Sequence, residues 1–249
     1  MTSFLASICT RLSALAVGTL LLVVPALAQT KPCVVELFTS QGCSSCPPAD
    51  AVLGSIAKTP GVIALSLPVD YWDYIGWKDT FASAQFTARQ KSYANARGDG
   101  RVYTPQAVID GIMHVVGSDS AGIARIADMS YGQSGAMTVP VSLSVRDKSF
   151  NIEIGKAGAE ASMGGTVWLL RIAKSRSVTI GRGENHGHTL TYTNIVRDMT
   201  KLGEWTGGVT KYEAPLRGAG PTDADGAAVI VQAGSLAHPG VILGAALAP

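Results

Sequence analysis

The sequence predicts an α/β first half followed by a β-rich, antiparallel second half. Between residues 33 and 132, short runs of β-branched and apolar residues alternate with segments whose apolar residues recur at helical spacing. Beyond about residue 135, apolar residues instead occupy every second position in short segments separated by glycine-rich turns. Two cysteines separated by two residues stand between the first predicted strand and the first predicted helix.

The first half is expected to begin with a buried strand and a helix that directly follows Pro47 and Pro48, since proline is tolerated in the first turn of a helix. Further along, the pair Asp110-Gly111 is typical of a tight hairpin between two short strands. The expected elements, in order, are a strand at 33–38, a helix at 49–58, a strand at 61–70, a helix at 78–97 that ends at Gly98, a strand pair within 105–117 and a helix at 120–129.

The second half shows a two-residue period most clearly between Val139 and Val145, where apolar residues alternate with polar residues and proline. Further strands are expected at 150–154, 165–174, 188–199 and 227–234. These strands predict an antiparallel sandwich or open barrel packed on the first half. The expected organisation is therefore a signal peptide at residues 1–28, a first domain at residues 29–134 and a β-rich domain at residues 135–249.

The first 28 residues have the layout of a secretory signal peptide. One charged residue, Arg11, precedes an apolar run from Leu12 to Val24, and Pro25 is followed by small residues. The run is short for a membrane-spanning helix, which needs about 20 apolar residues. We therefore expect cleavage near Gln29, a mature chain without a membrane span, and a periplasmic or secreted protein; an uncleaved anchor is the alternative.

Charge and cysteine content exclude several classes of protein. The chain has a formal net charge of +2 and no long run of like charges, so nothing indicates nucleic acid or an anionic membrane as a partner. Three of its four cysteines lie beyond the predicted signal peptide. Three cysteines are too few for the disulfide framework of a small secreted domain.

Cys43 and Cys46 are expected to form a reactive dithiol at the start of the first helix. Unpaired amides and the partial positive charge at a helix N-terminus stabilise a thiolate, so Cys43 is the expected nucleophile. Cys46, one turn further on, is the expected resolving thiol. Cys33 is not expected to pair with Cys43 or Cys46, because a strand over residues 33–39 would place it roughly 20 Å from the pair, whereas a disulfide requires Cα atoms within about 7 Å. It is expected to be a small, partly buried core residue, and pairing with another chain stays open.

The segment CVVELFTSQGCSSCP, residues 33–47, resembles the active-site segment of the thioredoxin-like proteins. The resemblance implies a thioredoxin-like fold with a cis-proline that faces the cysteine pair, and Thr104-Pro105 fits that position. It also implies a buried acid behind the resolving cysteine that accepts a proton. Glu36 is the corresponding residue here, at a spacing from Cys43 that is one residue longer than is usual in those proteins.

Longer strings in both halves, among them PVDYWDYIGWKDTFAS, VYTPQAVIDG and GENHGHTLTYTNIVR, are similar to the secreted bacterial proteins of the domain-of-unknown-function family 1223. This resemblance covers nearly all of the mature chain. It implies a thioredoxin-like fold and no established substrate.

The tract DYWDYIGW, residues 70–77, follows the second predicted strand. Loops that follow parallel strands gather on one edge of a sheet, and this edge carries the cysteine pair. The aromatic residues of the tract, Trp72 and Trp77 in particular, therefore either wall a substrate groove beside Cys43 or pack the two halves together.

The predicted function is thiol–disulfide exchange with protein thiols or disulfides of the envelope, without a cofactor or a metal. Thr104 and Pro105 would hold an extended segment of the partner, Cys43 would attack, Cys46 would resolve and Glu36 would move protons. Two alternatives stay open. One is a thioredoxin-like metal carrier that uses both cysteines and a histidine, and the other is an adaptor whose disulfide is only structural.

Overall fold

The computed structural model describes residues 31–158, 164–216 and 222–248. The predicted signal peptide, residues 1–28, lies outside the described residues. Among the helices that are described, none is long and apolar enough to cross a membrane.

The first half has the predicted alternation of strands and helices. The helix predicted at 78–97 begins only at Ala84, because the Ser83 side chain caps it by accepting a hydrogen bond from the Gln85 amide, and it ends at Gly98 as predicted. The elements are β1 (Cys33–Thr39), α1 (Pro47–Ile56), β2 (Val62–Pro68), η1 (Asp73–Ile75), α2 (Ala84–Arg97), β3 (Gln106–Ile109), β4 (Met113–Val116), α3 (Ser120–Ser130) and η2 (Gln133–Gly135).

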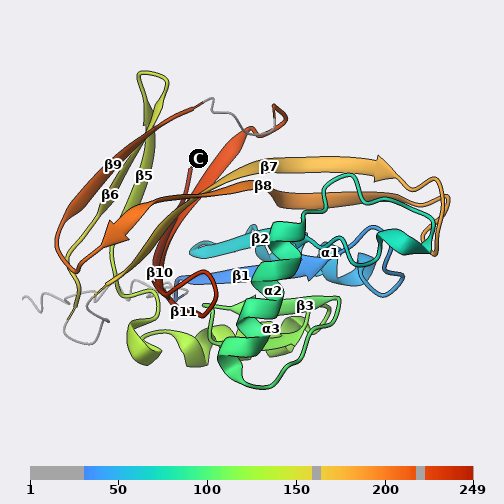
Figure 1. Ribbon diagram of the computed structural model, residues 1–249, viewed down its shortest axis with the longest axis horizontal. Coiled ribbons are helices and arrows are strands. Elements are labelled where there is room, and N and C mark those ends of the chain that lie inside the picture. The colour runs from blue at the N-terminus through green and yellow to red at the C-terminus, as the bar shows by residue number, and fades with distance from the viewer. Residues whose placement is uncertain (1–30, 159–163, 217–221, 249) are drawn as a thin grey trace, which may run out of the picture.

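The second half forms antiparallel strands, two of them much longer than predicted. These two, β7 and β8, make a hairpin that extends past the body of the sheet (Figure 1). The strands are β5 (Val141–Arg146), β6 (Ser149–Ile154), β7 (Gly165–Thr179), β8 (Thr189–Trp205), β9 (Thr210–Pro215), β10 (Gly226–Gly234) and β11 (Pro239–Leu247). Of these, β9 and β11 are not predicted from the sequence.

One eight-stranded sheet unites the two halves, in the order β11-β10-β7-β8-β2-β1-β3-β4. The halves meet where β2 and β8 run parallel, paired at Ser66 and Ile195. The Asn194 side-chain amide strengthens this junction by donating to the Ala64 carbonyl at 3.0 Å. The sheet is therefore continuous across the boundary predicted at residues 134 and 135.

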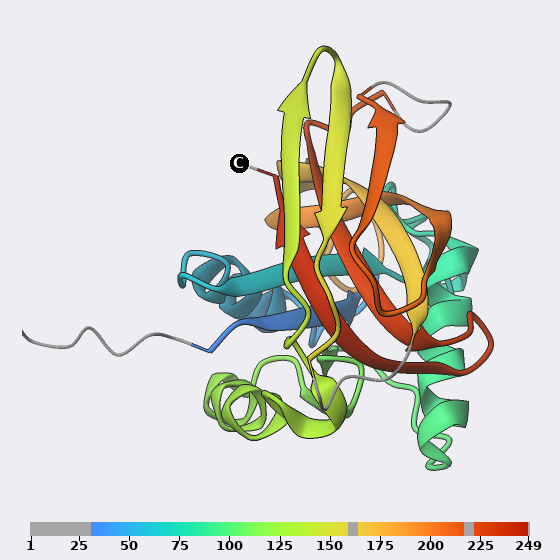
Figure 2. The same cartoon turned by 90° about the vertical axis from the view of Figure 1, so that its left-hand side faces the viewer.

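A sandwich forms where the second sheet, β5-β6-β9, covers β7, β10 and β11 (Figure 2). Phe150 and Ile152 of the small sheet share a buried core with Leu169 and Val229 of the large one. This arrangement is the sandwich expected from the two-residue period of the second half, because each strand buries one of its two faces.

The helices of the first half cover both faces of the large sheet. Val35 and Leu37 of β1 pack with α1 and α3, whereas Val34 and Phe38, on the other face of β1, pack with α2. Because successive side chains of a strand point to opposite faces, this division fixes the direction of every β1 residue, including Glu36. The turn from β1 into α1 carries the cysteine pair.

Candidate functional site

Cys43 and Cys46 form a disulfide in the turn between β1 and α1, with Cα atoms 5.4 Å apart. Cys46 is the N-cap residue of α1, and prolines fill the first positions of the helix, where the fixed φ of proline suits a helical start. The Cys46 amide donates to the Cys43 carbonyl at 3.1 Å, which closes the turn. Cys33 does not pair with Cys43 or Cys46, as predicted; it is free and buried, and burial raises the pKa of its thiol to about 12.

Both cysteines of the pair are buried, with exposed fractions of 1% for Cys43 and 0% for Cys46. The two serines between them are exposed. Gly42, just before the pair, lies against Trp72 and Ile75, and a Cβ at Gly42 would come within 3.2 Å of both side chains. A partner sulfur therefore needs neighbouring segments to move before it reaches Cys43.

The Thr104-Pro105 peptide bond is cis, as the resemblance to thioredoxin-like proteins implies. Pro105 lies close to the start of α1, because a Cβ added at Gly117 would meet both Pro105 and Ala49. The Trp72 indole N–H donates to the Thr104 hydroxyl at 2.7 Å. The structure thus brings together three predicted site residues, Trp72, Thr104 and Pro105, beside the helix that carries Cys46.

The aromatic tract divides into two parts with different surroundings. The Trp77 indole N–H donates to the Gln41 side-chain oxygen at 2.8 Å, and its ring faces Gly181 between β7 and β8, where a Cβ would lie 3.0 Å away. Trp77 therefore packs the two halves together. Tyr74, in contrast, is 81% exposed and stacks on Trp72, with ring centroids 6.5 Å apart.

The structure does not bring Glu36 to the cysteine pair. Its carboxylate accepts from Arg89 at 2.7 and 3.0 Å and from the Tyr93 hydroxyl at 2.5 Å, all of them buried. Arg89 and Tyr93 belong to α2, on the face of the sheet opposite to α1. The spacing between Glu36 and Cys43, one residue longer than is usual in thioredoxin-like proteins, agrees with this placement on the α2 face. Glu36 is therefore part of a structural ion pair with Arg89.

A different buried carboxyl group, that of Asp50, lies one helical turn after Cys46. Its backbone amide donates to the Cys46 carbonyl at 3.1 Å, and neither carboxyl oxygen has a hydrogen-bond partner among the described residues. Burial raises the pKa of Asp50 well above its usual range, Asp79 raises it further, and the Thr39 hydroxyl opposes the shift. Asp50 is not among the predicted site residues, although an acid four residues after Cys46 on an otherwise apolar helix face is a visible signal.

Asp79 supports the turn that carries the cysteine pair. Its carboxylate accepts from the Gln41 amide and from the Phe81 amide, both at 2.8 Å. Burial raises its pKa to about 6. Two buried acids with raised pKa values, Asp50 and Asp79, thus lie next to the segment that carries the cysteines.

The second half reaches the site through the β7–β8 loop, residues 180–188 (Figure 1). The Asn185 side-chain amide donates to the carbonyls of Gln41 and Cys43 at 2.9 and 3.0 Å. The Glu184 carboxylate accepts from the Ser44 amide at 3.2 Å. Neither residue is predicted to belong to the site, because no local pattern shows that a hairpin loop folds onto a turn about 140 residues earlier.

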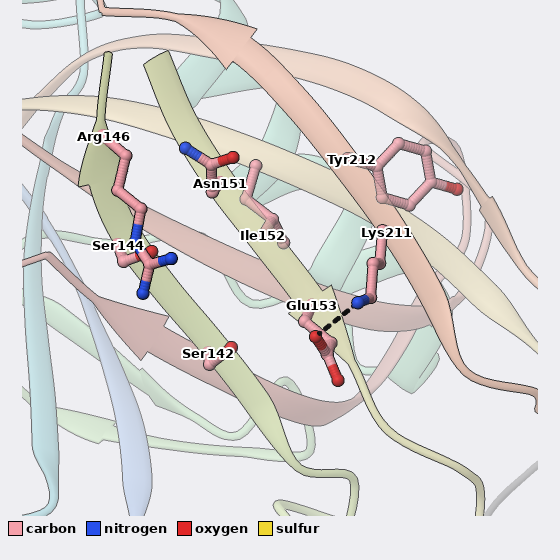
Figure 3. Close-up of a pocket in the computed structure, with 8 residues that line it drawn as sticks. All are labelled: Ser142, Ser144, Arg146, Asn151, Ile152, Glu153, Lys211 and Tyr212. Carbon is pink, nitrogen blue, oxygen red and sulfur yellow. Dashed lines mark ion pairs between the residues drawn. The ribbon is translucent and has the colours of Figure 1, made fainter. Parts of the chain in front are cut away.

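Other polar clusters lie elsewhere. A pocket of about 280 Å³ on the small sheet is lined by polar residues, including the ion pair of Lys211 and Glu153 at 3.2 Å (Figure 3). None of the predicted site residues lines it. Across the described part of the chain, no group of three or more His, Cys, Asp and Glu side chains is arranged to hold a metal ion.

Known proteins resemble this chain in fold and in part of its sequence. A crystal structure of a protein from Agrobacterium tumefaciens has a TM-score of 0.75 at 34% identity, covering 88% of this chain and 95% of that one. HBP35 of Porphyromonas gingivalis shares the fold, with a TM-score of 0.52 at 14% identity, over 88% of this chain and 74% of its own. A probable thioredoxin from Archaeoglobus fulgidus is 46% identical over 37 residues, which are 15% of this chain and 41% of that protein.

The family model described as "Protein of unknown function (DUF1223)" matches residues 34–232. This range includes the cysteine pair, the Thr104-Pro105 peptide and the β7–β8 loop. The chain therefore belongs to the DUF1223 family, with a thioredoxin-like first half that carries a Cys-x-x-Cys disulfide and a β-rich antiparallel second half.

Proposed function

We propose that this protein is an exported thiol–disulfide oxidoreductase that exchanges disulfides with envelope or secreted proteins. The Cys43–Cys46 disulfide at the start of α1, in a thioredoxin-like fold, carries the proposal. The leader-like composition of residues 1–28 supports a location in the periplasm or outside the cell, where protein disulfides persist.

The exchange has two steps, written here in the reducing direction. The Cys43 thiolate attacks one sulfur of the partner disulfide, forms a mixed disulfide and releases the other partner sulfur as a thiolate. The Cys46 thiolate then attacks the Cys43 sulfur and releases the second partner thiolate. Two electrons pass from the dithiol to the partner, and the Cys43–Cys46 disulfide is the product; oxidation of a partner dithiol is the same sequence in reverse.

The partner is bound beside Thr104, the half-buried Trp72 and the exposed Tyr74. An extended segment of the partner lies against the backbone of Thr104, before Pro105, in a strand-like contact. Trp72 holds the Thr104 hydroxyl at 2.7 Å, and Tyr74 extends the aromatic surface into solvent. Trp77 does not contact the partner in this scheme, because it packs between the first and second halves of the chain.

Asp50 takes the proton-transfer role that the sequence analysis gave to Glu36. Residues four apart share one face of a helix, so the Asp50 side chain lies on the Cys46 side of α1. A buried carboxyl with a raised pKa is suited to accept the thiol proton of Cys46, because its proton affinity is closer to that of a thiol than an ordinary aspartate's is. Asp50 also lines a cavity of about 430 Å³ between α1 and β8, while its carboxyl oxygens are themselves buried.

Trapping the mixed disulfide tests the proposal. The Cys46→Ala variant should accumulate a covalent adduct through Cys43 with envelope proteins or with a model peptide disulfide, and dithiothreitol should release it. Cys33→Ala in the same background is the matched control and should leave the adduct unchanged. The absence of any adduct, with Cys43 shown to be reduced, would contradict the exchange mechanism.

A second candidate function is a binding module whose disulfide is structural. The near-complete burial of both cysteines favours it, since a structural disulfide needs no access. This candidate predicts that the native disulfide resists dithiothreitol until the protein unfolds. The oxidoreductase proposal predicts reduction of the folded protein, followed by far-ultraviolet circular dichroism that stays native.

A further inference from the structure

We propose that the β7–β8 loop controls the reactivity of Cys43 and that Glu184 is the positioning residue that does so. The inference rests on the proposed function and assigns a role to the second half of the chain. Two groups compete for the hydrogen bond of the Ser44 backbone amide: the Glu184 carboxylate and the thiolate of Cys43, the expected nucleophile.

Asn185 fixes the loop against the active-site turn. It is buried, and its side-chain amide satisfies two carbonyl oxygens, those of Gln41 and Cys43, at 2.9 and 3.0 Å. Both ends of the loop are tied as well, because the Ile180 amide donates to the His188 carbonyl at 2.9 Å. The loop is therefore held at a defined position relative to Cys43.

Two glycines allow the loop to adopt this shape. Gly183 and Gly187 have φ values of +79° and +80°, a region that residues with a side chain rarely occupy. Gly183 also lies close to Trp77, where an added Cβ would be 3.4 Å from the Trp77 side chain. This shape directs the neighbouring Glu184 side chain towards the turn.

The Glu184 side chain forms a hydrogen bond with the backbone amide of Ser44. Its carboxylate accepts from that amide at 3.2 Å, and the side chain is solvent-exposed. The start of α1 offers a Cys43 thiolate its partial positive charge but no free amide, because the first two helical positions are prolines and the Cys46 amide donates to the Cys43 carbonyl. The backbone amide of Ser44, which follows Cys43, is a second nearby source of stabilisation. Glu184 opposes both gains, because it takes the adjacent amide and adds a negative charge beside Cys43. Glu184 therefore disfavours the reduced thiolate form and makes the couple more reducing.

The charge and the hydrogen bond can be separated by substitution. Glu184→Gln keeps an acceptor oxygen but removes the charge, whereas Glu184→Ala removes both. Glu213→Gln, on exposed β9, is the matched control for a change of net charge. The readouts are the pH dependence of Cys43 alkylation in the reduced protein and the equilibrium with glutathione, each in low salt and in 1 M KCl.

Both Glu184 variants should lower the pKa of the Cys43 thiol by about half a unit to one unit. The glutathione equilibrium should shift roughly three- to tenfold towards the reduced pair, since one pKa unit corresponds to a factor of ten. The shift in Glu184→Gln should shrink in 1 M KCl, because salt screens an exposed charge. A merely structural role for Glu184 would give no such salt dependence.

An unchanged alkylation profile in both variants would overturn the inference, as would a change in Glu184→Ala alone. The alkylation pKa can be measured whether or not the pair turns over. A wild-type pair that never equilibrates with glutathione would instead refute the proposed function, so the two failures are distinguishable.

Discussion

The side-chain amide of Asn185 donates a hydrogen bond to the carbonyl oxygen of Cys43 at 3.0 Å, although the two residues are 142 positions apart in the chain. The turn that carries the cysteines therefore depends on the β-rich half as well as on β1 and α1. The extension of the β7–β8 hairpin beyond the sheet brings Asn185 to this turn.

Removing the Asn185 amide should loosen the turn that carries the cysteine pair. Asn185→Ala leaves the carbonyls of Gln41 and Cys43 without that donor, which we expect to lower the free energy of unfolding by about 1–3 kcal/mol. The reduced Cys43 should also become faster to alkylate, because it is buried in the wild type. Urea titration and timed alkylation check both effects, with Asn151→Ala on the small sheet as a control. If Asn185→Ala kept wild-type stability and wild-type Cys43 reactivity, the hydrogen bonds of Asn185 would not support the turn.

Replacing Asp50 should slow the second step of exchange and leave the first unchanged. Asp50→Asn cannot accept the proton of Cys46, and positioned proton acceptors typically contribute a factor of about 10²–10⁴. Release of a preformed mixed disulfide, followed in single turnover, should therefore slow at least tenfold. Glu36→Gln serves as the comparison, since Glu36 lies on the α2 face. Slower release in Glu36→Gln alone would restore the original assignment of Glu36.

The same Asp50→Asn variant should be more stable than the wild type at neutral pH. The pKa of Asp50 is raised in the folded protein, so the folded state holds this proton more tightly than the unfolded chain does. The wild type therefore loses stability as the pH rises above the ordinary pKa of an aspartate. The gain from Asp50→Asn should be small at pH 4 and larger at pH 7.5, from urea unfolding at both pH values. Equal gains at the two pH values would show that ionisation of Asp50 is not the cause.

Shortening Tyr74 should affect protein partners and spare small thiols. Tyr74 is 81% exposed and stacked on Trp72, so its loss removes surface without disturbing the core. For Tyr74→Ala we expect a severalfold higher KM with a peptide disulfide and unchanged kcat, together with unchanged exchange with glutathione. Tyr131→Ala, an exposed residue just after α3, is the control. An equal loss with glutathione would place Tyr74 in the chemistry and not in partner binding.

Local signals in the sequence were sufficient for the first half of the fold. The proline pair marks the start of α1, Gly98 marks the end of α2, and Asp110-Gly111 marks the β3–β4 turn. Each is a short-range feature whose physical cause lies within a few residues. The edge strand β11, in contrast, has the glycine-interrupted sequence PGVILGAAL, and its strand form depends on pairing with β10.

The cysteines and the cis-proline of the site were predictable, but their supports were not. The resemblance to thioredoxin-like proteins predicts a proton-transfer role for Glu36 from its position before the cysteines. The alternation of side chains in β1 instead points Glu36 towards Arg89. The contacts of Asn185 and Glu184 arise from the tertiary placement of a hairpin, which leaves no trace in residue spacing.

The redox equilibrium of the Cys43–Cys46 pair with glutathione tests the central claim most directly. The account predicts reversible exchange in the folded protein, with a measurable potential and with Cys43 as the thiol that alkylates first. A pair that stays oxidised under strong reductant until the protein unfolds would contradict it and would identify the disulfide as a structural link.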